Sequence, residues 1–387
     1  MRIVDIMEFT LNTGEQRANA VMDFSGMTTG FVALVTDVMR DGKPVVGYGF
    51  SGTGRYSQNA ICRERLIPRL LSARPEELVN EAGDNFDPFR IWDCMMRNEK
   101  PGGHGDRAIA VATLDMAVWD AAAKIAGEPL HAFLAARHGS GVPPARVPVY
   151  VGGGYYRSDR DYAALQDEIR RYLDNGFTVM KIKFAGAPLE EDLRRIDAVL
   201  EVLPAGQLAI DANGRYSLQE ALTCAHRIQP YGLRWFEEPG YPLDYQLQAE
   251  VAKAYDGPLA GGECLLSSWD AQNLLRYGGL RPDRDILQFD CALSYGICEY
   301  IRTIGIMEDF GWSRGSLFPH GGHLLSLHIT AGLGLGGTEV YPYTHQPVGG
   351  FTDGLEVAEG SVALPQLPGL GFEGKSNLHE LLSQRFA

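Results

Sequence analysis

Short apolar runs alternate with longer amphipathic segments through the second half of the chain. The runs lie at 178–182, 207–210, 233–236, 258–261, 286–289 and 316–319. Most are apolar throughout, as is typical of strands buried on both faces. The segments between them, such as 189–203, 217–228 and 268–277, have the apolar spacing of amphipathic helices. Strand followed by helix, repeated, predicts a parallel sheet with right-handed crossovers that closes into a barrel.

Seven polar residues each stand at or just after the end of a short apolar run. The gaps between them are 28, 26, 26, 27, 30 and 19 residues, close to the length of one strand, one helix and two loops. Reactive side chains of a (β/α) barrel gather at the carboxyl ends of its strands. We therefore expect these residues to meet on one rim: Lys183, Asp211, Glu237, Glu263, Asp290, His320 and Glu339.

The residues before the barrel predict a separate domain. With 387 residues the chain is long enough for about two domains, and the barrel pattern begins near 147–151. Before it come predicted strands and then predicted helices, an order that indicates an α+β domain. The strands are expected at 2–11, 31–38 and 45–50, and the helices at 64–71, 75–82 and 109–125. We expect a capping domain at 1–130, the barrel at 131–350, and a tail at 351–387 that returns to the capping domain.

Charge and composition argue against nucleic acid and membrane as binding partners. The net charge is −14, from 35 basic and 49 acidic residues without a basic run, so a nucleic-acid backbone is a poor partner. Asp115 and Asp120 interrupt the longest apolar stretch, which argues against a membrane span. Asp5 and Glu8 stand where a signal peptide would need an apolar core. We expect a cytoplasmic protein whose six cysteines, none in a CxxC pair, are free thiols.

Three of the strand-end residues form a candidate metal site. Asp211, Glu237 and Glu263 offer hard carboxylate oxygens, which suit Mg²⁺ better than zinc. The segment after Asp211 faintly matches a calcium loop, but its twelfth position is Leu222 and not Glu. Glu238 is expected to point away from Glu237, so we take Glu237 as the ligand and Glu238 as its neighbour.

A lysine pair precedes this trio. Lys181 and Lys183 lie two residues apart on one strand, so their side chains share a face with Cα atoms roughly 6.6 Å apart. An unperturbed lysine, with a pKa of about 10.4, is protonated at pH 7 and cannot act as a base. Two charges ~7 Å apart at an effective dielectric of 20 repel by roughly 2.4 kcal/mol. We therefore expect Lys181 to lower the pKa of Lys183.

A histidine lies on the other side of the trio. His320 and Asp290 end adjacent predicted strands, and a carboxylate beside imidazole fixes its tautomer, which favours an acid or base role for His320. His323 begins a predicted helix and is assigned a structural role, although a metal site using both histidines is conceivable. The glycines at 332, 334 and 337 match a dinucleotide fingerprint, but no strand precedes them, so we reject that interpretation.

The whole set resembles the enolase superfamily, in its mandelate racemase branch. The motifs are Lys-x-Lys, Asp-x-Asn, Glu-Glu-Pro, Gly-Glu and an Asp/His pair, joined by the segments 115–120 and 127–130. The resemblance implies a (β/α)₇β TIM-like barrel with an α+β capping domain, and Mg²⁺-assisted removal of the proton α to a carboxylate. This superfamily uses a Lys or His base with Mg²⁺ at an ene-diolate.

Longer strings are similar to the D-tartrate dehydratases of that branch. They lie at 27–29, 98–105, 288–296 and 319–323, together with Asn19. The resemblance implies that Lys183 is the base, that His320 is the acid, and that Asn19, Lys100 and Glu339 contact substrate. Where those enzymes carry an Asn-rich loop, this chain has Ser51-Gly52-Thr53. We expect Thr53 and the Tyr155-Tyr156 turn to help read the substrate's hydroxyl configuration.

The leading hypothesis is a lyase that dehydrates a small hydroxy-dicarboxylate, D-tartrate to oxaloacetate being favoured, in a homo-oligomer. The same residues could serve a racemase or another acid-sugar dehydratase. A Schiff-base aldolase would use a barrel lysine as nucleophile and would need no metal. A non-catalytic barrel is a further alternative, and it predicts no Mg²⁺ binding.

Overall fold

A ring of parallel strands forms the centre of the molecule. The computed structural model describes residues 1–52, 56–156 and 162–386. Each strand of the ring is parallel to its neighbours, and β10 pairs with β4. In chain order they are β4 (Arg146–Gly153), β5 (Met180–Lys183), β6 (Leu208–Asp211), β7 (Phe236–Glu237), β8 (Leu259–Gly261), β9 (Ile286–Leu287) and β10 (Thr338–Val340). One further position, Leu317, closes the ring between β9 and β10.

The segment around Leu317 is less regular than its sequence predicts. We expected a strand at 316–319, but Leu317 makes a single parallel bridge with Leu287, and the phenylalanine after it donates its backbone N–H to the Leu287 carbonyl. A tight turn at Arg314–Ser316 precedes it, and Pro319, which has no N–H, follows it. Because proline cannot donate to a strand ladder, the pairing ends there.

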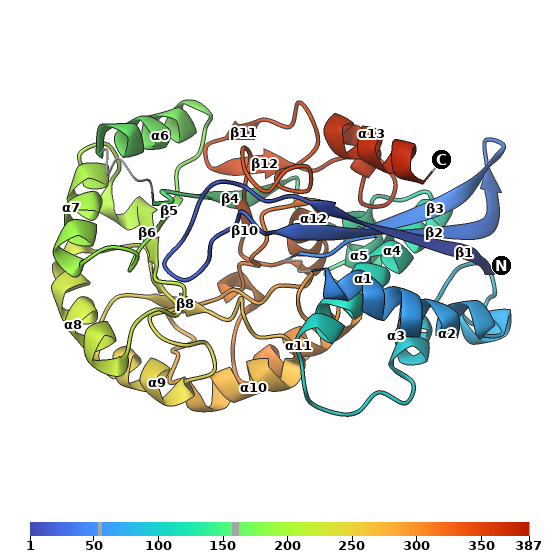
Figure 1. The fold of residues 1–387 in the computed structure, drawn as a ribbon, viewed down its shortest axis with the longest axis horizontal. Coiled ribbons are helices and arrows are strands. Elements are labelled where there is room, and N and C mark those ends of the chain that lie inside the picture. Colours follow the sequence, from blue (N-terminus) through green and yellow to red (C-terminus); the bar gives the residue numbers. More distant parts are fainter. Residues whose placement is uncertain (53–55, 157–161, 387) are drawn as a thin grey trace.

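A helix follows each of the first seven ring positions and covers the outside of the barrel (Figure 1). Their apolar faces point to the strands; in α8, Ala221, Cys224, Ala225 and Ile228 are buried, and Ser217 caps its first turn. They are α6 (Tyr162–Asp174), α7 (Leu189–Leu200), α8 (Leu218–Ile228), α9 (Tyr245–Ala254), α10 (Ser268–Tyr277), α11 (Ile297–Asp309) and α12 (Leu324–Leu333). The predicted (β/α)₇β barrel is confirmed.

The capping region packs an antiparallel sheet on helices. Its strands β1 (Ile3–Asn12), β2 (Thr28–Arg40) and β3 (Lys43–Phe50) pair in that order. A β-carbon at Gly47 or Gly49 would lie 2.0 Å from a carbonyl oxygen of α4, so these glycines let the sheet approach that helix closely. The helices are α1 (Ser57–Ile61), α2 (Ile67–Ser72), α3 (Pro88–Met96), α4 (Asp106–Ala126) and α5 (Leu130–His138).

One predicted helix of this region is wrong. Only Pro75–Glu77 of the expected helix at 75–82 forms a helical turn. Val79 instead bridges to Phe86 in an antiparallel pair, and Gly83 has a positive φ of 72° at the turn between them. The glycine and neighbouring Asn and Asp residues favour that turn over a helix.

The C-terminal residues contact both parts. The hairpin of β11 (Val357–Ala358) and β12 (Ser361–Ala363) pairs antiparallel with the barrel strand β4. Beyond it, α13 (Ser376–Arg385) leads to Phe386, whose ring lies 5.0 Å from that of Phe9 in the capping sheet. We keep the division into 1–130, 131–350 and 351–387 as a proposal.

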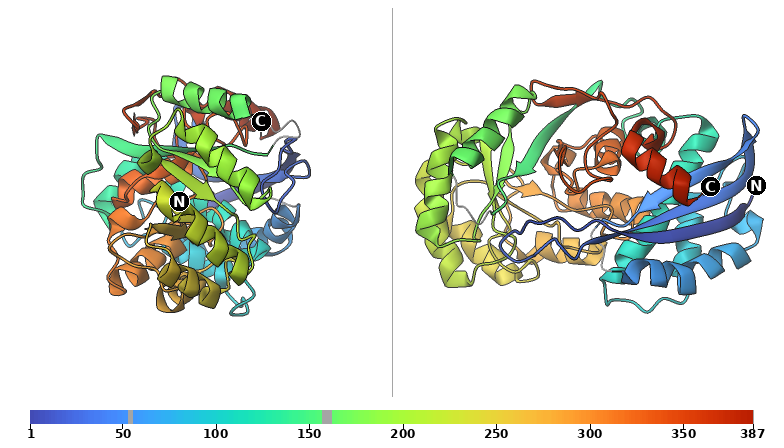
Figure 2. Two further views of the ribbon diagram at one scale, coloured as in Figure 1. Left: turned by 90° about the vertical axis from the view of Figure 1, so that its left-hand side faces the viewer. Right: turned by 45° about the horizontal axis from the view of Figure 1, so that its top comes forward.

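The loop between β1 and β2 reaches from the capping sheet across to the barrel, as both figures show (Figures 1 and 2). It is joined to the barrel side by a backbone bridge between Ala18 and Tyr156. The Glu15 carboxylate also accepts the backbone N–H of His345 at 2.6 Å. Residues of this loop are thereby held over the carboxyl ends of the strands. In the described part of the chain, no helix is both long enough and apolar enough to cross a membrane.

A buried histidine pair between α5 and α12 makes stability depend on pH. His328 Nδ1 accepts the backbone N–H of His131 at 3.0 Å, and burial lowers the pKa of His328 to about 3 and of His131 to about 4, from 6.5. Below pH 6.5 the unfolded chain takes up protons that the folded chain does not, so the free energy of unfolding falls as pH falls from 6.5 toward 4. Each histidine contributes up to roughly 1.4 kcal/mol per pH unit.

We therefore expect His328→Asn to flatten this dependence. The amide oxygen of asparagine can still accept a hydrogen bond but does not titrate. Urea unfolding at pH 7, 6, 5 and 4.5 should show a smaller loss of stability in the variant than in the wild type. If the free energy of unfolding fell equally steeply with pH in the variant and in the wild type, the pair would be excluded as a source of acid sensitivity.

Candidate active site

Three carboxylates from neighbouring strands converge at the barrel rim. Asp211 ends β6, Glu237 ends β7, and Glu263 follows β8 by two residues. One oxygen of each lies within 4.8 Å of the others, and all three side chains are buried. The register pairs Asp211 with Glu237 across adjacent strands, which places them side by side. The trio expected from the sequence is thus brought together.

The chemistry of this donor set fits a hard divalent cation. All three donors are carboxylates, the ligands that Mg²⁺ and Ca²⁺ prefer. Burial and the charge of Asp211 raise the pKa of Glu237 to about 8, although Lys181 acts in the opposite direction. Among the described residues, Glu263 Oε2 has no hydrogen-bond partner. Buried like charges are stabilised by a cation between them.

The two lysines form ion pairs with the carboxylates around them. Lys181 Nζ lies 2.6 Å from Glu237 Oε1 and 2.9 Å from Glu339 Oε1. Lys183 Nζ lies 2.5 Å from Asp211 Oδ2. Although burial opposes it, the charge of Asp211 holds the pKa of Lys183 above its usual range. The charge of Lys181 does act to lower this pKa, as predicted, but the charge of Asp211 outweighs it, so the net shift is upward.

His320 faces the trio from the opposite end. Its Nδ1 lies 2.7 Å from Asp290 Oδ2, and its Nε2 lies 3.5 Å from Glu263 Oε2. Burial opposes protonation, but the charge of Glu263 and the hydrogen bond to Asp290 raise the pKa of His320 to about 10. These two carboxylates therefore favour the protonated imidazole. Asp290 is itself fixed, since its Oδ1 accepts the N–H of Ala292 at 2.7 Å.

A cavity of about 390 Å³ joins these groups. Lys183 and His320 both line it, together with Glu263 and Asp290 from the rim. The capping loop contributes Asn19, and Tyr155 lies beside Lys183, whose Nζ is 5.6 Å from the ring centroid. The structure thus places Lys183, His320 and two of the rim carboxylates around one space.

Three other expected site residues do not line this cavity. Tyr156 faces α7, where its hydroxyl donates to Asp192 Oδ1 at 2.7 Å, so it supports the rim and does not line the cavity. Glu339 is fully buried and is not among the cavity-lining residues, but its Oε1 lies 2.9 Å from Lys181 Nζ and its Oε2 lies 3.8 Å from His320 Nε2. Lys100 lines a different cavity, of about 700 Å³, beside α3, α10 and α11. Thr53 lies outside the described residues.

Several supporting residues were missed from the sequence. Trp235 Nε1 and Gln288 Nε2 donate to Glu237 Oε2 at 2.9 and 2.7 Å, and they fix that carboxylate. Asn213 Nδ2 donates to Asp211 Oδ2 at 3.0 Å. Two of the three could have been found, because Trp235 stands two residues before Glu237 and Asn213 two residues after Asp211. Gln288 directly follows β9, and only the fold brings it there.

Metal binding at the trio should be visible as thermal stabilisation. A cation bound only by the folded chain adds about 2.7 kcal/mol at one hundred times its dissociation constant. We expect Mg²⁺ to raise the melting temperature of the wild type and to have little effect on Glu263→Gln. Scanning fluorimetry with a Mg²⁺ series measures this, and Glu250→Gln on the exposed face of α9 is the matched control. An equal rise of the melting temperature in Glu263→Gln and Glu250→Gln would show that the cation binds outside the trio.

Comparison with known proteins agrees with this arrangement. The enolase C-terminal domain-like family model matches residues 164–377, and the N-terminal domain model of mandelate racemase / muconate lactonizing enzyme matches residues 7–135. The chain is 30% identical to an arabinonate dehydratase of Saccharolobus solfataricus, over 87% of this chain and 86% of the relative.

Solved structures share the fold. A racemase from Streptomyces coelicolor with bound magnesium superposes with a TM-score of 0.78 at 24% identity, covering 99% of both chains. L-Talarate dehydratase from Polaromonas sp. JS666, complexed with Mg and L-glucarate, superposes with a TM-score of 0.72 at 25% identity, covering 89% of both. The chain belongs to the enolase superfamily, in its mandelate racemase branch.

Proposed function

We propose that this protein is a Mg²⁺-dependent acid-sugar dehydratase. The observation that carries the proposal is the placement of Lys183 and His320 at the two ends of the carboxylate trio, both lining one cavity. The relatives named a dehydratase of arabinonate and one of L-talarate support the same reaction class. Mg²⁺ is supported by the oxygen-only donor set and by the magnesium in the talarate enzyme.

The base step belongs to Lys183. Its Nζ, in the neutral form, would accept the proton from the carbon α to the substrate carboxylate. Asp211, Glu237 and Glu263 would hold the cation, which would supply positive charge to the substrate carboxylate and offset the Asp211 charge that retains the Lys183 proton. Lys181, paired with Glu237 and Glu339, positions the trio and neutralises part of its charge.

The acid step belongs to His320. Asp290 holds Nδ1, so Nε2 is the nitrogen directed at the cavity. Its proton would pass to the departing β-hydroxyl, which leaves as water, and the resulting enol becomes a 2-keto acid. The protonated imidazole suits this donor role.

The substrate is a small acid sugar. Within this class we propose D-tartrate, giving oxaloacetate, on the motifs at 98–105 and 288–296, while Asn19 and Tyr155 would contact its hydroxyl groups. Lys100 is left out of the proposed contacts because it lines the other cavity.

Screening the purified protein with Mg²⁺ against mono- and diacid sugars, including both tartrate enantiomers, tests this. A semicarbazide assay detects the keto-acid product, and we expect it for at least one acid sugar. A racemase would invert its substrate without keto acid, which polarimetry would detect. Keto acid from other acid sugars but not from D-tartrate would exclude that substrate and retain the reaction class.

A further inference from the structure

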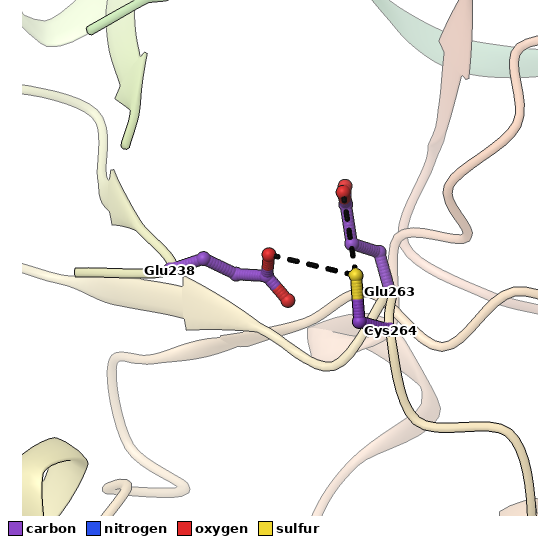
Figure 3. Close-up of side chains that lie close together, drawn as sticks. All are labelled: Glu238, Glu263 and Cys264. Atoms are coloured by element: carbon purple, nitrogen blue, oxygen red, sulfur yellow. Dashed lines mark hydrogen bonds between the residues drawn. The ribbon is translucent and has the colours of Figure 1, made fainter. Parts of the chain in front are cut away.

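A second set of metal-ligand atoms lies beside the carboxylate trio. Figure 3 shows the side chains of Glu238, Glu263 and Cys264 facing one another at the barrel rim. One ligand atom of each lies within 4.8 Å of the others. Cys264 Sγ is 3.9 Å from Glu238 Oε2 and 4.0 Å from Glu263 Oε1. We call these three residues the thiol–carboxylate cluster.

Glu238 is an unusual member of this cluster. The sequence assigned it no ligand role, and in the structure a positive φ of 40° turns the backbone at Glu238, directly after β7. Its side chain is consequently buried, with 4% of the residue exposed, and its carboxylate faces Cys264 (Figure 3). In the described part of the chain, Glu238 Oε1 has no hydrogen-bond partner. A buried carboxylate with a free oxygen is costly unless a cation or proton compensates it.

The thiol is open to the cavity. Cys264 is exposed and lines the same 390 Å³ space as Lys183 and His320, whereas the other five cysteines are buried. An ion that enters the cavity can therefore reach Sγ without a rearrangement of the core.

We propose that the thiol–carboxylate cluster binds a borderline-soft divalent cation of the zinc and cadmium class. A mixed sulfur and oxygen set favours such ions over Mg²⁺. With Zn–S of about 2.3 Å and Zn–O of about 2.0 Å, tetrahedral ligands lie roughly 3.5 Å apart. The observed sulfur–oxygen distances need to shorten by only about half an ångström. The S–H proton goes to solvent as the metal–sulfur bond forms, and no electron is transferred.

The cluster shares one ligand with the trio. Glu263 belongs to both sets, so a cation bound by Glu238, Glu263 and Cys264 withdraws this carboxylate from the Mg²⁺ position. Binding of the two ions is then competitive. This inference goes beyond the proposed function, because it predicts an inhibitory cation whatever the substrate is.

Cadmium titration tests the proposal without any assay of activity. A cadmium–thiolate bond produces charge-transfer absorption in the ultraviolet. We expect one equivalent of this signal in the wild type and in Cys94→Ala, which removes a buried thiol from α3, and none in Cys264→Ser. Calorimetry should show the apparent dissociation constant of Mg²⁺ rising at least tenfold in the presence of cadmium, and less in Cys264→Ser.

Two results would overturn the proposal. The first is no thiolate absorption in the wild type at saturating cadmium. The second is equal competition with Mg²⁺ in the wild type and in Cys264→Ser, which would place cadmium among the carboxylates of the trio. Glu238→Gln should weaken cadmium binding at least tenfold and Mg²⁺ binding by less, and the reverse order would also exclude the cluster.

Discussion

Lys183→Ala is expected to lower turnover by at least roughly 10³-fold, within the range of general acid–base catalysis. The variant lacks the amine that would accept the α-proton, and no other described lysine lines the cavity. The variant should lose both keto-acid formation and exchange of the substrate α-hydrogen with solvent deuterium. NMR measures the exchange. Mg²⁺ binding should remain, because the three carboxylates are intact.

The matched control is Lys253→Ala, which removes an exposed lysine from α9. It should keep wild-type turnover. Near-wild-type turnover in Lys183→Ala would instead show that the base lies elsewhere. Loss of Mg²⁺ binding in that variant would mean that Lys183 supports the trio through its ion pair with Asp211 and would leave its role as base unsupported.

His320→Asn is expected to separate the two halves of the reaction. Asparagine can keep a hydrogen bond to Asp290, but it has no proton to give at neutral pH. Keto-acid formation should fall by roughly 10²- to 10⁴-fold while Lys183 continues to exchange the α-hydrogen. NMR in deuterated water measures exchange, and the semicarbazide assay measures product.

Exchange of the substrate α-hydrogen in His320→Asn decides which residue is the base. Loss of both exchange and product in His320→Asn, at unchanged Mg²⁺ affinity, would make His320 the base and contradict our assignment. Asp290→Asn should lower product formation less than His320→Asn does, because the imidazole remains but loses the hydrogen bond that directs Nε2 at the cavity.

The barrel could be predicted because its signal is periodic and repeated. Polar residues stand at or just after the ends of successive predicted strands at similar intervals, and the crossover rule predicts that they meet on one rim. The strand near Leu317 was less predictable. Pro319 cannot donate a backbone hydrogen bond, so the segment forms a single β-bridge in place of a regular strand. The helix expected at 75–82 failed because a turn and a bridge from Val79 to Phe86 replaced it.

The electrostatics of the site could be predicted only in part. Two lysines on one strand face predict mutual repulsion, but the sequence does not show that Glu339 and Glu237 compensate Lys181. Lys181 acts to lower the pKa of Lys183 as expected, but the charge of Asp211 outweighs it, so the net shift is upward. In the same way, the sequence does not show the positive φ at Glu238 or that its carboxylate lies beside Cys264.

Three functional residues occupy paired positions on neighbouring strands. Lys183 of β5 pairs with Asp211 of β6, which in turn pairs with Glu237 of β7. Adjacent strands are held about 4.8 Å apart by backbone hydrogen bonds, so the separation of the functional groups is a property of the main chain. Side chains at these positions can be exchanged without moving their neighbours. A slip of one residue would turn every group to the other face at once. The backbone thus holds these positions fixed, and substitution of the side chains alone can change the reaction that the site catalyses.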